Sequence, residues 1–353
     1  MENREILILT PGFPKDEEDT SCIPSLQIFV KALSEQSGLK VRVVTTQYPF
    51  QIGTYQWHGI PVHACGGNNR DFPIKLFTIL KAYWYLLLYG RKAKAIQCFW
   101  LMECSLIGLI WGQILNIKTV CRVQGQDCKA GNGYFGFIRF FSKLKNVSIV
   151  CISQFAADQL LKNGKIKTTE IIPDGIDIEK ITNGGLKNER TTDLIGVGNL
   201  SSLKNYSQFI KVVSLIVNEI PNLKASIIGE GEQREILEKM ISDLGLRHNI
   251  KLYGFLPRSE VLEKMKGSKI FLHTSLWEAQ GYVLMEALSM GCYVVASPVG
   301  YLFPSQKSFI SSDSQDIART ISKILQSENQ DYSPIKLPNT QETIRKYLRI
   351  YWK

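Results

Sequence analysis

The sequence predicts an α/β protein made of two doubly wound, Rossmann-like domains. Short apolar runs alternate with longer helical stretches along most of the chain, which is the pattern of parallel sheets covered by helices. A chain of 353 residues is too long for one compact core. A polar stretch with paired glycines, residues 181–192, interrupts the alternation and predicts a linker between the two domains.

The first domain is expected over residues 1–180. It begins with Glu5–Thr10, a continuous apolar run of the kind found in strands that are buried on both faces. Later runs of the same type predict the other strands and helices. The strands are expected at 41–46, 60–65, 95–100, 119–123 and 147–152, and the helices at 24–36, 72–89, 104–115, 135–145 and 154–163.

The second domain is expected over residues 193–335 and repeats the alternation. Its strands are predicted at 194–197, 225–228, 250–253, 270–273 and 293–296, with helices between them. Residues 341–352 are amphipathic at helical spacing, so we assign 336–353 to a C-terminal helix.

Composition narrows the class of protein. The 42 basic residues exceed the 32 acidic ones by 10, a surplus that attracts acidic surfaces but does not choose among them. No recognised RNA- or DNA-binding motif is present, so we expect no nucleic-acid partner. The eight cysteines form no Cys-x-x-Cys pair and are expected to be reduced core thiols rather than a disulfide framework. The chain enters a strand at once, without a basic leader or a long apolar signal region, and is expected in the cytosol.

Two carboxylates, Glu278 and Glu286, mark the most informative stretch. They bracket a segment that opens a helix directly after the apolar strand 269–273. In an open parallel sheet, ligands bind where strands lead into helices. Gly281 lets backbone amides approach a ligand closely, and the amides after it belong to a helix N-terminus, which favours phosphate and other anions.

Residues 275–291 resemble the two-glutamate signature of the retaining, glycogen-synthase-like glycosyltransferases of group 1. Residues 197–205, 228–231 and 252–257 follow that family's order and spacing, and 171–177 is similar to the segment before its interdomain linker. The resemblance covers about residues 147–300. It implies the GT-B architecture, in which two Rossmann-like domains face each other across a cleft and the last helix crosses back to the first domain.

The resemblance implies roles on the donor side. Lys204, on the loop after the strand 194–197, would stabilise the charge that grows on the leaving diphosphate, whereas by itself it could equally be a solvated loop lysine. Glu278 would contact hydroxyl groups of the donor sugar and Glu286 those of the ribose, because an ionised carboxylate is a pure hydrogen-bond acceptor. Backbone and apolar contacts to the donor are expected from Phe255, Leu256, Gln280, Gly281, Tyr282 and Val283.

Alternatives exist for the two glutamates. Glu286 could lie on the solvent face of its helix, although apolar neighbours surround it in the sequence. The pair could also be the acid and nucleophile of a glycosidase, which must flank one glycosidic bond. Their spacing across a loop and a helix suits one extended ligand better.

The sequence also departs from the family. Asn199 stands where an arginine commonly supplies a second charge to the phosphates, and Arg122 is our candidate to replace that charge. Gly12 is the one useful glycine of a first loop that, in the family, is usually glycine-rich and closes over the phosphates. Gln124 stands where many relatives have a histidine near the transferred sugar. Gln124, Arg122 and Asp127 are therefore our candidates on the acceptor and sugar side.

No general base or nucleophile is evident. The four histidines match no catalytic position, and His273, inside a strand, is expected to be an ordinary core residue. The resemblance therefore implies front-face displacement with retention of configuration. The enzyme mainly orients the substrates and stabilises charge, without a cofactor or a metal ion.

Residues 72–94 form the segment of the sequence that bears on whether the protein binds a membrane. The segment is too short and too interrupted by Lys81 to span a bilayer. Aromatic residues followed by a basic tail suit a helix at an anionic membrane surface, while packing on the first sheet is the alternative.

These patterns together predict a metal-independent glycosyltransferase of hexosyltransferase type. It would move a sugar from a nucleotide-diphosphate sugar to a saccharide acceptor, and we expect a lipid-linked acceptor in cell-envelope polysaccharide synthesis. Such an enzyme would be cytosolic and peripheral at the inner face of the membrane. Two alternatives remain, a non-catalytic nucleotide-sugar-binding protein and a sugar-nucleotide epimerase.

Overall fold

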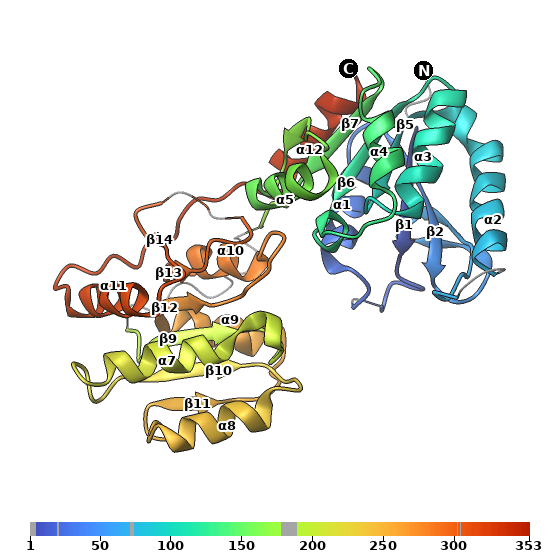
Figure 1. Cartoon of the computed structure of the whole chain (residues 1–353). Helices are drawn as coiled ribbons and strands as arrows, with labels where there is room; N and C mark the ends of the chain where they lie inside the picture. The colour runs from blue at the N-terminus through green and yellow to red at the C-terminus, as the bar shows by residue number, and fades with distance from the viewer. Residues whose placement is uncertain (1–4, 20, 71–73, 178–188, 302, 304) are drawn as a thin grey trace. The chain divides into compact units, whose positions relative to one another are not determined.

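The computed structural model describes residues 5–19, 21–70, 74–177, 189–301, 303 and 305–353. The chain divides into two compact units, a first unit of residues 1–175 with 338–353 and a second unit of residues 176–337 (Figure 1). Of the expected linker 181–192, residues 181–188 lie outside the described residues.

The first unit is built on one twisted sheet. Among the described residues its eight strands lie in the order β3-β4-β2-β1-β5-β6-β7-β8. All neighbours pair in parallel except β3, which is antiparallel to β4. The strands are β1 (Glu5–Gly12), β2 (Lys40–Tyr48), β3 (Gly53–Trp57), β4 (Ile60–Ala64), β5 (Ala93–Phe99), β6 (Lys118–Val123), β7 (Val147–Cys151) and β8 (Glu170–Ile171).

Helices cover this sheet and explain its apolar strands. The helices are α1 (Pro24–Ser34), α2 (Ile74–Tyr89), α3 (Glu103–Ile114), α4 (Phe135–Phe141), α5 (Gln154–Gly164) and α12 (Thr340–Tyr351). In β1, every residue from Ile6 to Leu9 is fully buried, as expected when both faces of a parallel strand are covered. The doubly wound prediction is confirmed for this half of the chain.

The last helix, α12, belongs to the first unit. It packs against α1, and its buried residues Ile344 and Tyr347 join the core around β1. The hydroxyl of Tyr351 donates to Gln97 Oε1 at 2.8 Å, and Asn339 caps the helix by accepting from the amide of Glu342 at 2.9 Å. The expected return of the C-terminal helix is confirmed.

Three short strands were missed by the sequence. β3 follows the loop after β2 and joins β4 through His58 and Gly59, both with positive φ, as in a two-residue hairpin turn. The other two, β8 and β14 (Ser308–Ile310), contain two and three residues at the sheet edges. Such short runs carry too little periodicity to be predicted.

The second unit holds a smaller sheet that is parallel throughout. Among the described residues its six strands lie in the order β11-β10-β9-β12-β13-β14. The remaining elements of this sheet and its cover are β9 (Thr192–Val197), β10 (Ala225–Ile228), β11 (Ile250–Leu252), β12 (Ser268–His273), β13 (Tyr293–Ala296), α7 (Tyr206–Ile216), α8 (Arg234–Asp243), α9 (Arg258–Lys266), α10 (Tyr282–Ser289) and α11 (Ser314–Gln326).

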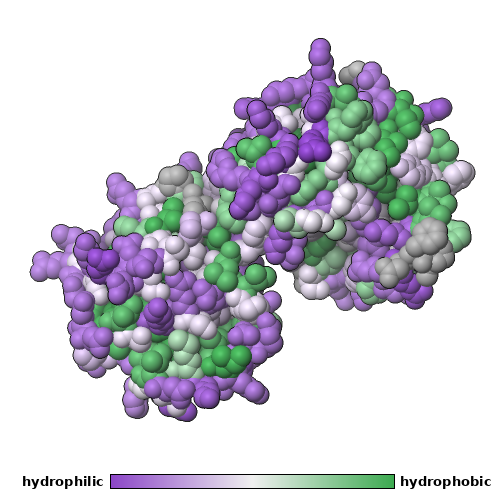
Figure 2. Space-filling view, in the orientation of Figure 1, coloured by the Kyte–Doolittle hydropathy of each residue, from purple (hydrophilic) through white to green (hydrophobic). Residues whose placement is uncertain are grey.

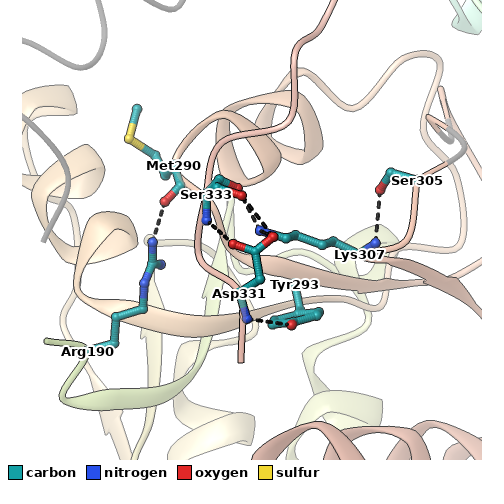
Figure 3. A network of polar contacts seen from close by, with 7 residues as sticks. All are labelled: Arg190, Met290, Tyr293, Ser305, Lys307, Asp331 and Ser333. Atoms are coloured by element: carbon teal, nitrogen blue, oxygen red, sulfur yellow. Dashed lines mark hydrogen bonds and ion pairs between the residues drawn. The ribbon is translucent and has the colours of Figure 1, made fainter. Parts of the chain in front are cut away.

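Two buried cations, Arg190 and Lys307, hold neighbouring segments of the second unit together (Figure 3). Arg190 donates to the carbonyl of Met290 at 2.5 Å. Lys307 donates to the carbonyl of Ser333 at 2.6 Å and pairs with Asp331 at 3.3 Å. Tyr293, whose hydroxyl accepts from the amide of Asp331, begins β13, so this network lies at the amino ends of the strands.

Two further expectations concern the whole chain. All eight cysteines are free, and all except the partly buried Cys22 are buried, which confirms the prediction of core thiols. In the part of the chain that the structure describes, no helix combines the length and the apolar composition needed to cross a bilayer.

Candidate functional site

The second sheet changes its winding direction between β9 and β12. From β9 the chain winds outward to β10 and β11, and it then returns to the other side of β9 with β12, β13 and β14. Ligands of open parallel sheets bind beyond the carboxyl ends of the strands at such a switch point. Lys204 lies on the loop after β9 and Glu278 on the loop after β12, so both predicted catalytic residues flank it.

Lys204 and Glu278 are in direct contact. The ammonium Nζ of Lys204 lies 2.5 Å from Oε2 of Glu278, and both side chains are about three-quarters buried. Two hydrogen bonds to backbone carbonyls also join the two loops. Thr274 Oγ1 donates to the carbonyl of Lys204 at 3.0 Å, and the amide of Leu276 donates to the carbonyl of Leu203 at 2.8 Å. The loops therefore form one connected surface.

Glu278 is ionised in this setting. Burial raises the pKa of its carboxyl group, but the neighbouring His273 and the charge of Lys204 outweigh burial and hold the pKa at about 2. A carboxylate with four acceptor positions and one cation partner can still accept hydrogen bonds from sugar hydroxyls.

The helix α10 begins beside these residues. Gly281, at its N-terminus, has φ of +72°, and a Cβ there would lie 3.0 Å from Cγ of Glu278. Glycine is therefore required both for the left-handed backbone and for the close approach to Glu278. Gln280 is buried and donates to Met285 Sδ at 3.1 Å, while Tyr282 and Val283 are half-buried on the first turn. The positive end of α10 thus opens at the switch point.

Glu286 is buried one turn further along α10. Its Oε1 lies 2.5 Å from Nη2 of Arg258, a residue that is 62% exposed. This contact is an ion pair only, because Oε1 has no hydrogen-bond partner within the described part of the chain. Burial raises the pKa of Glu286, and the charge of Arg258 opposes that rise. The alternative of a solvent-facing Glu286 is wrong.

The other donor-side residues lie on neighbouring loops. Phe255, after β11, is 79% exposed, and Leu256 is half-buried. A phenylalanine with so much of its ring in water is available for a planar ligand. Asn199 is exposed on the same loop as Lys204.

Arg122 is not available as a second phosphate ligand. Only 1% of the side chain is exposed, and its guanidinium pairs with Asp174. The guanidinium carbon Cζ lies 5.4–5.6 Å from the ring centroids of Phe29, Phe99 and Tyr347. The prediction that Arg122 replaces the charge missing at Asn199 is wrong, because this cation is part of the first unit's core.

Asp127 is likewise used internally. It is buried, and its carboxylate accepts from the amides of Leu101 at 2.8 Å, Gly125 at 2.7 Å and Gln124 at 3.1 Å. These bonds shape the turn after β6, so Asp127 is not an acceptor-side ligand. Gln124 itself is half-buried just beyond the carboxyl end of β6.

Gly12 ends β1 and is buried, paired with Tyr48 of β2. A Cβ at this position would lie 3.4 Å from Cδ1 of Ile23, so there is little spare room. Its role beside the diphosphate stays a prediction.

Two residues of the site were missed by the sequence. His273, expected in an ordinary core position, is buried but places Nε2 3.0 Å from Ser275 Oγ and 3.8 Å from Glu278 Oε2. Arg258 reaches Glu286 from the first turn of α9. The only available signals were that His273 ends its strand at the site's edge and that Arg258 directly follows the segment 252–257.

The fold and this site define a class of protein that binds an anionic, hydroxyl-rich ligand at the switch point of a Rossmann-like unit. Residues 177–339, nearly the whole second unit, match the family model "Glycosyl transferases group 1". The second unit, which carries Lys204 and Glu278, therefore belongs to the group 1 glycosyltransferases.

Glycosyltransferases of known name are similar to this chain in sequence. The chain is 26% identical over 318 residues to the gpi3 subunit of phosphatidylinositol N-acetylglucosaminyltransferase from Schizosaccharomyces pombe, covering 82% of this chain and 66% of that protein. It is 27% identical over 247 residues to the UDP-Gal:alpha-D-GlcNAc-diphosphoundecaprenol alpha-1,3-galactosyltransferase of Escherichia coli, covering 64% and 61%. The chain thus spans less than two thirds of the length of each of these relatives.

The fold has solved counterparts as well. The structure of Anabaena HepE in complex with UDP superimposes with a TM-score of 0.67 at 17% identity, covering 99% of this chain and 97% of that one. At this identity the likeness establishes the fold alone, which is the GT-B fold predicted from the sequence.

Proposed function

We propose that this protein is a retaining glycosyltransferase that moves a hexose from a nucleoside-diphosphate sugar to a saccharide acceptor. The observation that carries the proposal is the meeting of Lys204 and Glu278 at the switch point of the second sheet, beside the N-terminus of α10. A diphosphate needs a cation and backbone amides, and a sugar needs a fixed acceptor. These groups lie next to one another here.

Each donor moiety has a partner in this proposal. Lys204 exchanges Glu278 for the diphosphate, whose charge grows as the anomeric bond breaks. Glu278 then accepts hydrogen bonds from the sugar. The buried Oε1 of Glu286, which lacks a hydrogen-bond partner within the described residues, accepts from the ribose.

The reaction needs no base from the protein. The acceptor oxygen forms its bond to the anomeric carbon on the face that the diphosphate leaves, and the proton of the acceptor hydroxyl passes to the departing phosphate oxygen. The protein orients the partners and stabilises the charge on the diphosphate. Retention of configuration follows from family membership.

Uridine diphosphate is the first candidate for the nucleotide. HepE was solved with UDP, and the name of the relative from Escherichia coli specifies UDP-Gal as donor. In this proposal Phe255, which is 79% exposed, and Leu256 contact the base. Arg258, which pairs with Glu286, lies near the ribose.

A lipid-linked acceptor is supported by one face of the first unit. The helix α2 buries Ala82 and Leu86 but exposes six large apolar residues: Leu76, Phe77, Leu80, Trp84, Leu87 and Leu88. Phe137 and Phe140 of α4 are exposed as well, and α3 packs against both helices. In Figure 2, hydrophobic patches lie over the region where Figure 1 labels α2, α3 and α4.

Charge favours an anionic bilayer as the occupant of this face. From Phe72 to Met102 the sequence holds five basic residues and no acidic one: Lys75, Lys81, Arg91, Lys92 and Lys94. Cations beside an apolar helix face are the pattern of interfacial binding, each worth about 1 kcal/mol near an anionic surface. We therefore place the enzyme at the inner face of a membrane, acting on a lipid-linked saccharide of a cell-envelope polysaccharide.

A donor screen tests the function. Melting temperatures are measured with the UDP, GDP and ADP forms of common hexoses on the wild-type protein, Lys204→Ala, Glu286→Gln and the exposed control Lys211→Ala. One nucleotide class should stabilise the wild-type protein and Lys211→Ala but neither site variant. Stabilisation by no nucleotide sugar would contradict the proposal.

Turnover separates the alternatives. A non-catalytic binder holds the donor but releases no nucleoside diphosphate when a lipid-linked saccharide is supplied. An epimerase consumes the donor without any acceptor. The transferase requires both substrates.

A further inference from the structure

His273 is a buried polar residue that the proposed chemistry leaves without a role. It ends β12, its side chain is 4% exposed, and its ring stacks on Phe271 with an angle of 22° between the planes. Its Nε2 points to the site, 3.0 Å from Ser275 Oγ and 3.8 Å from Glu278 Oε2. The opposite ring nitrogen, Nδ1, is buried and has no hydrogen-bond partner among the described residues.

The charges nearby select the form of the imidazole. Burial lowers the pKa of His273, so the ring is neutral and carries a single N–H. The ionised Glu278 can only accept, and it faces Nε2. The tautomer with hydrogen on Nε2 is therefore favoured, although the buried lone pair of Nδ1 then has no hydrogen-bond donor among the described residues. A core histidine without a site role would satisfy Nδ1 instead.

The approach of His273 Nε2 to Glu278 matters most when the donor sugar is bound. In the structure Glu278 is held by Lys204, which the proposed function assigns to the diphosphate. Once Lys204 turns to the phosphates, the carboxylate loses its cation partner. His273 is held in place by β12 and by the hydrogen bonds that join the two loops, so it stays beside Glu278.

We propose that His273 is a positioning residue, whose Nε2–H holds the Glu278 carboxylate toward the donor sugar while Lys204 contacts the diphosphate. This inference rests on the proposed function and adds a second, neutral support for Glu278. In the structure Nε2 lies 3.8 Å from Glu278 Oε2, which is longer than a hydrogen bond, and pairs with Ser275 Oγ at 3.0 Å. We expect the distance from Nε2 to Oε2 to shorten to that of a hydrogen bond once Lys204 contacts the diphosphate and no longer pairs with Oε2 of Glu278.

Two variants test the role. In His273→Ala the N–H is lost, whereas in His273→Gln the side-chain amide places an N–H close to the position of Nε2. The readout is the dissociation constant of the UDP-hexose that stabilises the wild-type protein, measured by calorimetry beside that of UDP alone. A purely structural residue would change both constants together.

The expected result is a split between the two ligands. His273→Ala weakens UDP-hexose binding about 10-fold, the loss of one charge-assisted hydrogen bond, and leaves UDP binding within about twofold. His273→Gln restores UDP-hexose binding to within about threefold of wild type. If His273→Ala does not fold, His273→Asn takes its place, since its shorter amide cannot reach Glu278.

Either of two results overturns the inference. Equal weakening of UDP and UDP-hexose, or no weakening of either, removes the positioning role while the proposed function stands. A wild-type protein that binds no nucleotide sugar overturns the proposed function and this inference with it.

Discussion

Lys204 and Glu278 share a 2.5 Å contact between Nζ and Oε2 across two loops that lie 74 positions apart in the sequence. Each loop follows a strand, β9 or β12, and these strands are neighbours in the sheet. The contact holds two groups of opposite charge at the point where a charged ligand with hydroxyl groups is expected.

The first prediction concerns acid stability. The pKa of Glu278 is held at about 2, below the ordinary 4.5, so this group stabilises the folded state above pH 4.5 and the stabilisation is lost as pH falls toward 2. The full displacement corresponds to roughly 3 kcal/mol, shared between His273 and Lys204. Lys204→Met removes part of it. The difference in unfolding free energy between wild type and Lys204→Met should therefore be constant above pH 5 and shrink below pH 4.5.

Urea denaturation of the second unit between pH 3 and pH 7 measures this difference. Lys211→Met, on the exposed face of α7, serves as the control and should show no such change with pH. A gap that persists unchanged down to pH 3 would mean that the Lys204 pair does not depress the pKa of Glu278.

The second prediction tests the ribose contact. Glu286 has a buried Oε1 that no hydrogen bond occupies within the described residues, and a ribose hydroxyl can fill that position. Wild type should bind a nucleoside diphosphate about 10-fold more tightly than its 2′-deoxy analogue, and Glu286→Gln should bind both alike. Calorimetric titration of the two ligands provides the check. Discrimination retained in Glu286→Gln would assign the ribose to another residue.

The third prediction concerns Arg122 as a core cation. Its removal breaks the ion pair with Asp174 and opens a space among Phe29, Phe99 and Tyr347. Breaking a buried ion pair from one side typically costs about 3–5 kcal/mol. Arg122→Ala should therefore unfold the first unit at a clearly lower temperature. Arg139→Ala, on the exposed face of α4, should leave the melting temperature unchanged.

The same variant separates the two roles discussed for Arg122. If nucleotide affinity falls in Arg122→Ala while the melting temperature stays the same, Arg122 acts on the ligand and the core assignment is wrong.

The fourth prediction concerns the exposed face of α2. The double variant Phe77→Ser with Trp84→Ser removes two large side chains that are 69% and 57% exposed. Because burying such a side chain is worth about 1.5–3 kcal/mol, flotation with vesicles rich in anionic lipid should fall more than 10-fold. Thermal stability should change little.

A matched variant provides the control. Ile236→Ser with Leu244→Ser alters exposed apolar residues in the α8 region of the second unit and should float like the wild type. Wild-type protein that stays unbound at low salt would remove the membrane from the proposed function.

The sequence predicted the sheets well because buried parallel strands are continuous apolar runs. Glu5–Thr10 and 270–273 were located to within two residues at each end. The missed strand β3 alternates exposed and buried residues and pairs antiparallel at an edge, where polar residues dilute the signal. Lys204, Glu278 and Gly281 lie on loops that directly follow predicted strands, so their place in the fold could be predicted. Their roles come from the resemblance and stay predictions.

The errors at the site come from burial, which a linear pattern does not specify. Arg122 and Asp127 lie near strand ends, as ligands do, yet both are buried in the first unit. Arg122 pairs with Asp174 there, and Asp127 accepts from backbone amides. Conversely, His273 was assigned to the core because it ends an apolar strand. Its second nitrogen reaches the site only through the turn that brings Ser275 and Glu278 back over the strand end.

The most direct measurement is the affinity of Lys204→Ala for UDP, UDP-hexose and uridine, compared with wild type. If Lys204 binds the diphosphate, loss of a charge-assisted bond worth about 1.5–3 kcal/mol should weaken UDP and UDP-hexose by roughly 10- to 100-fold and leave uridine unaffected. Equal affinity of both proteins for UDP would contradict the account, because the diphosphate would then bind elsewhere.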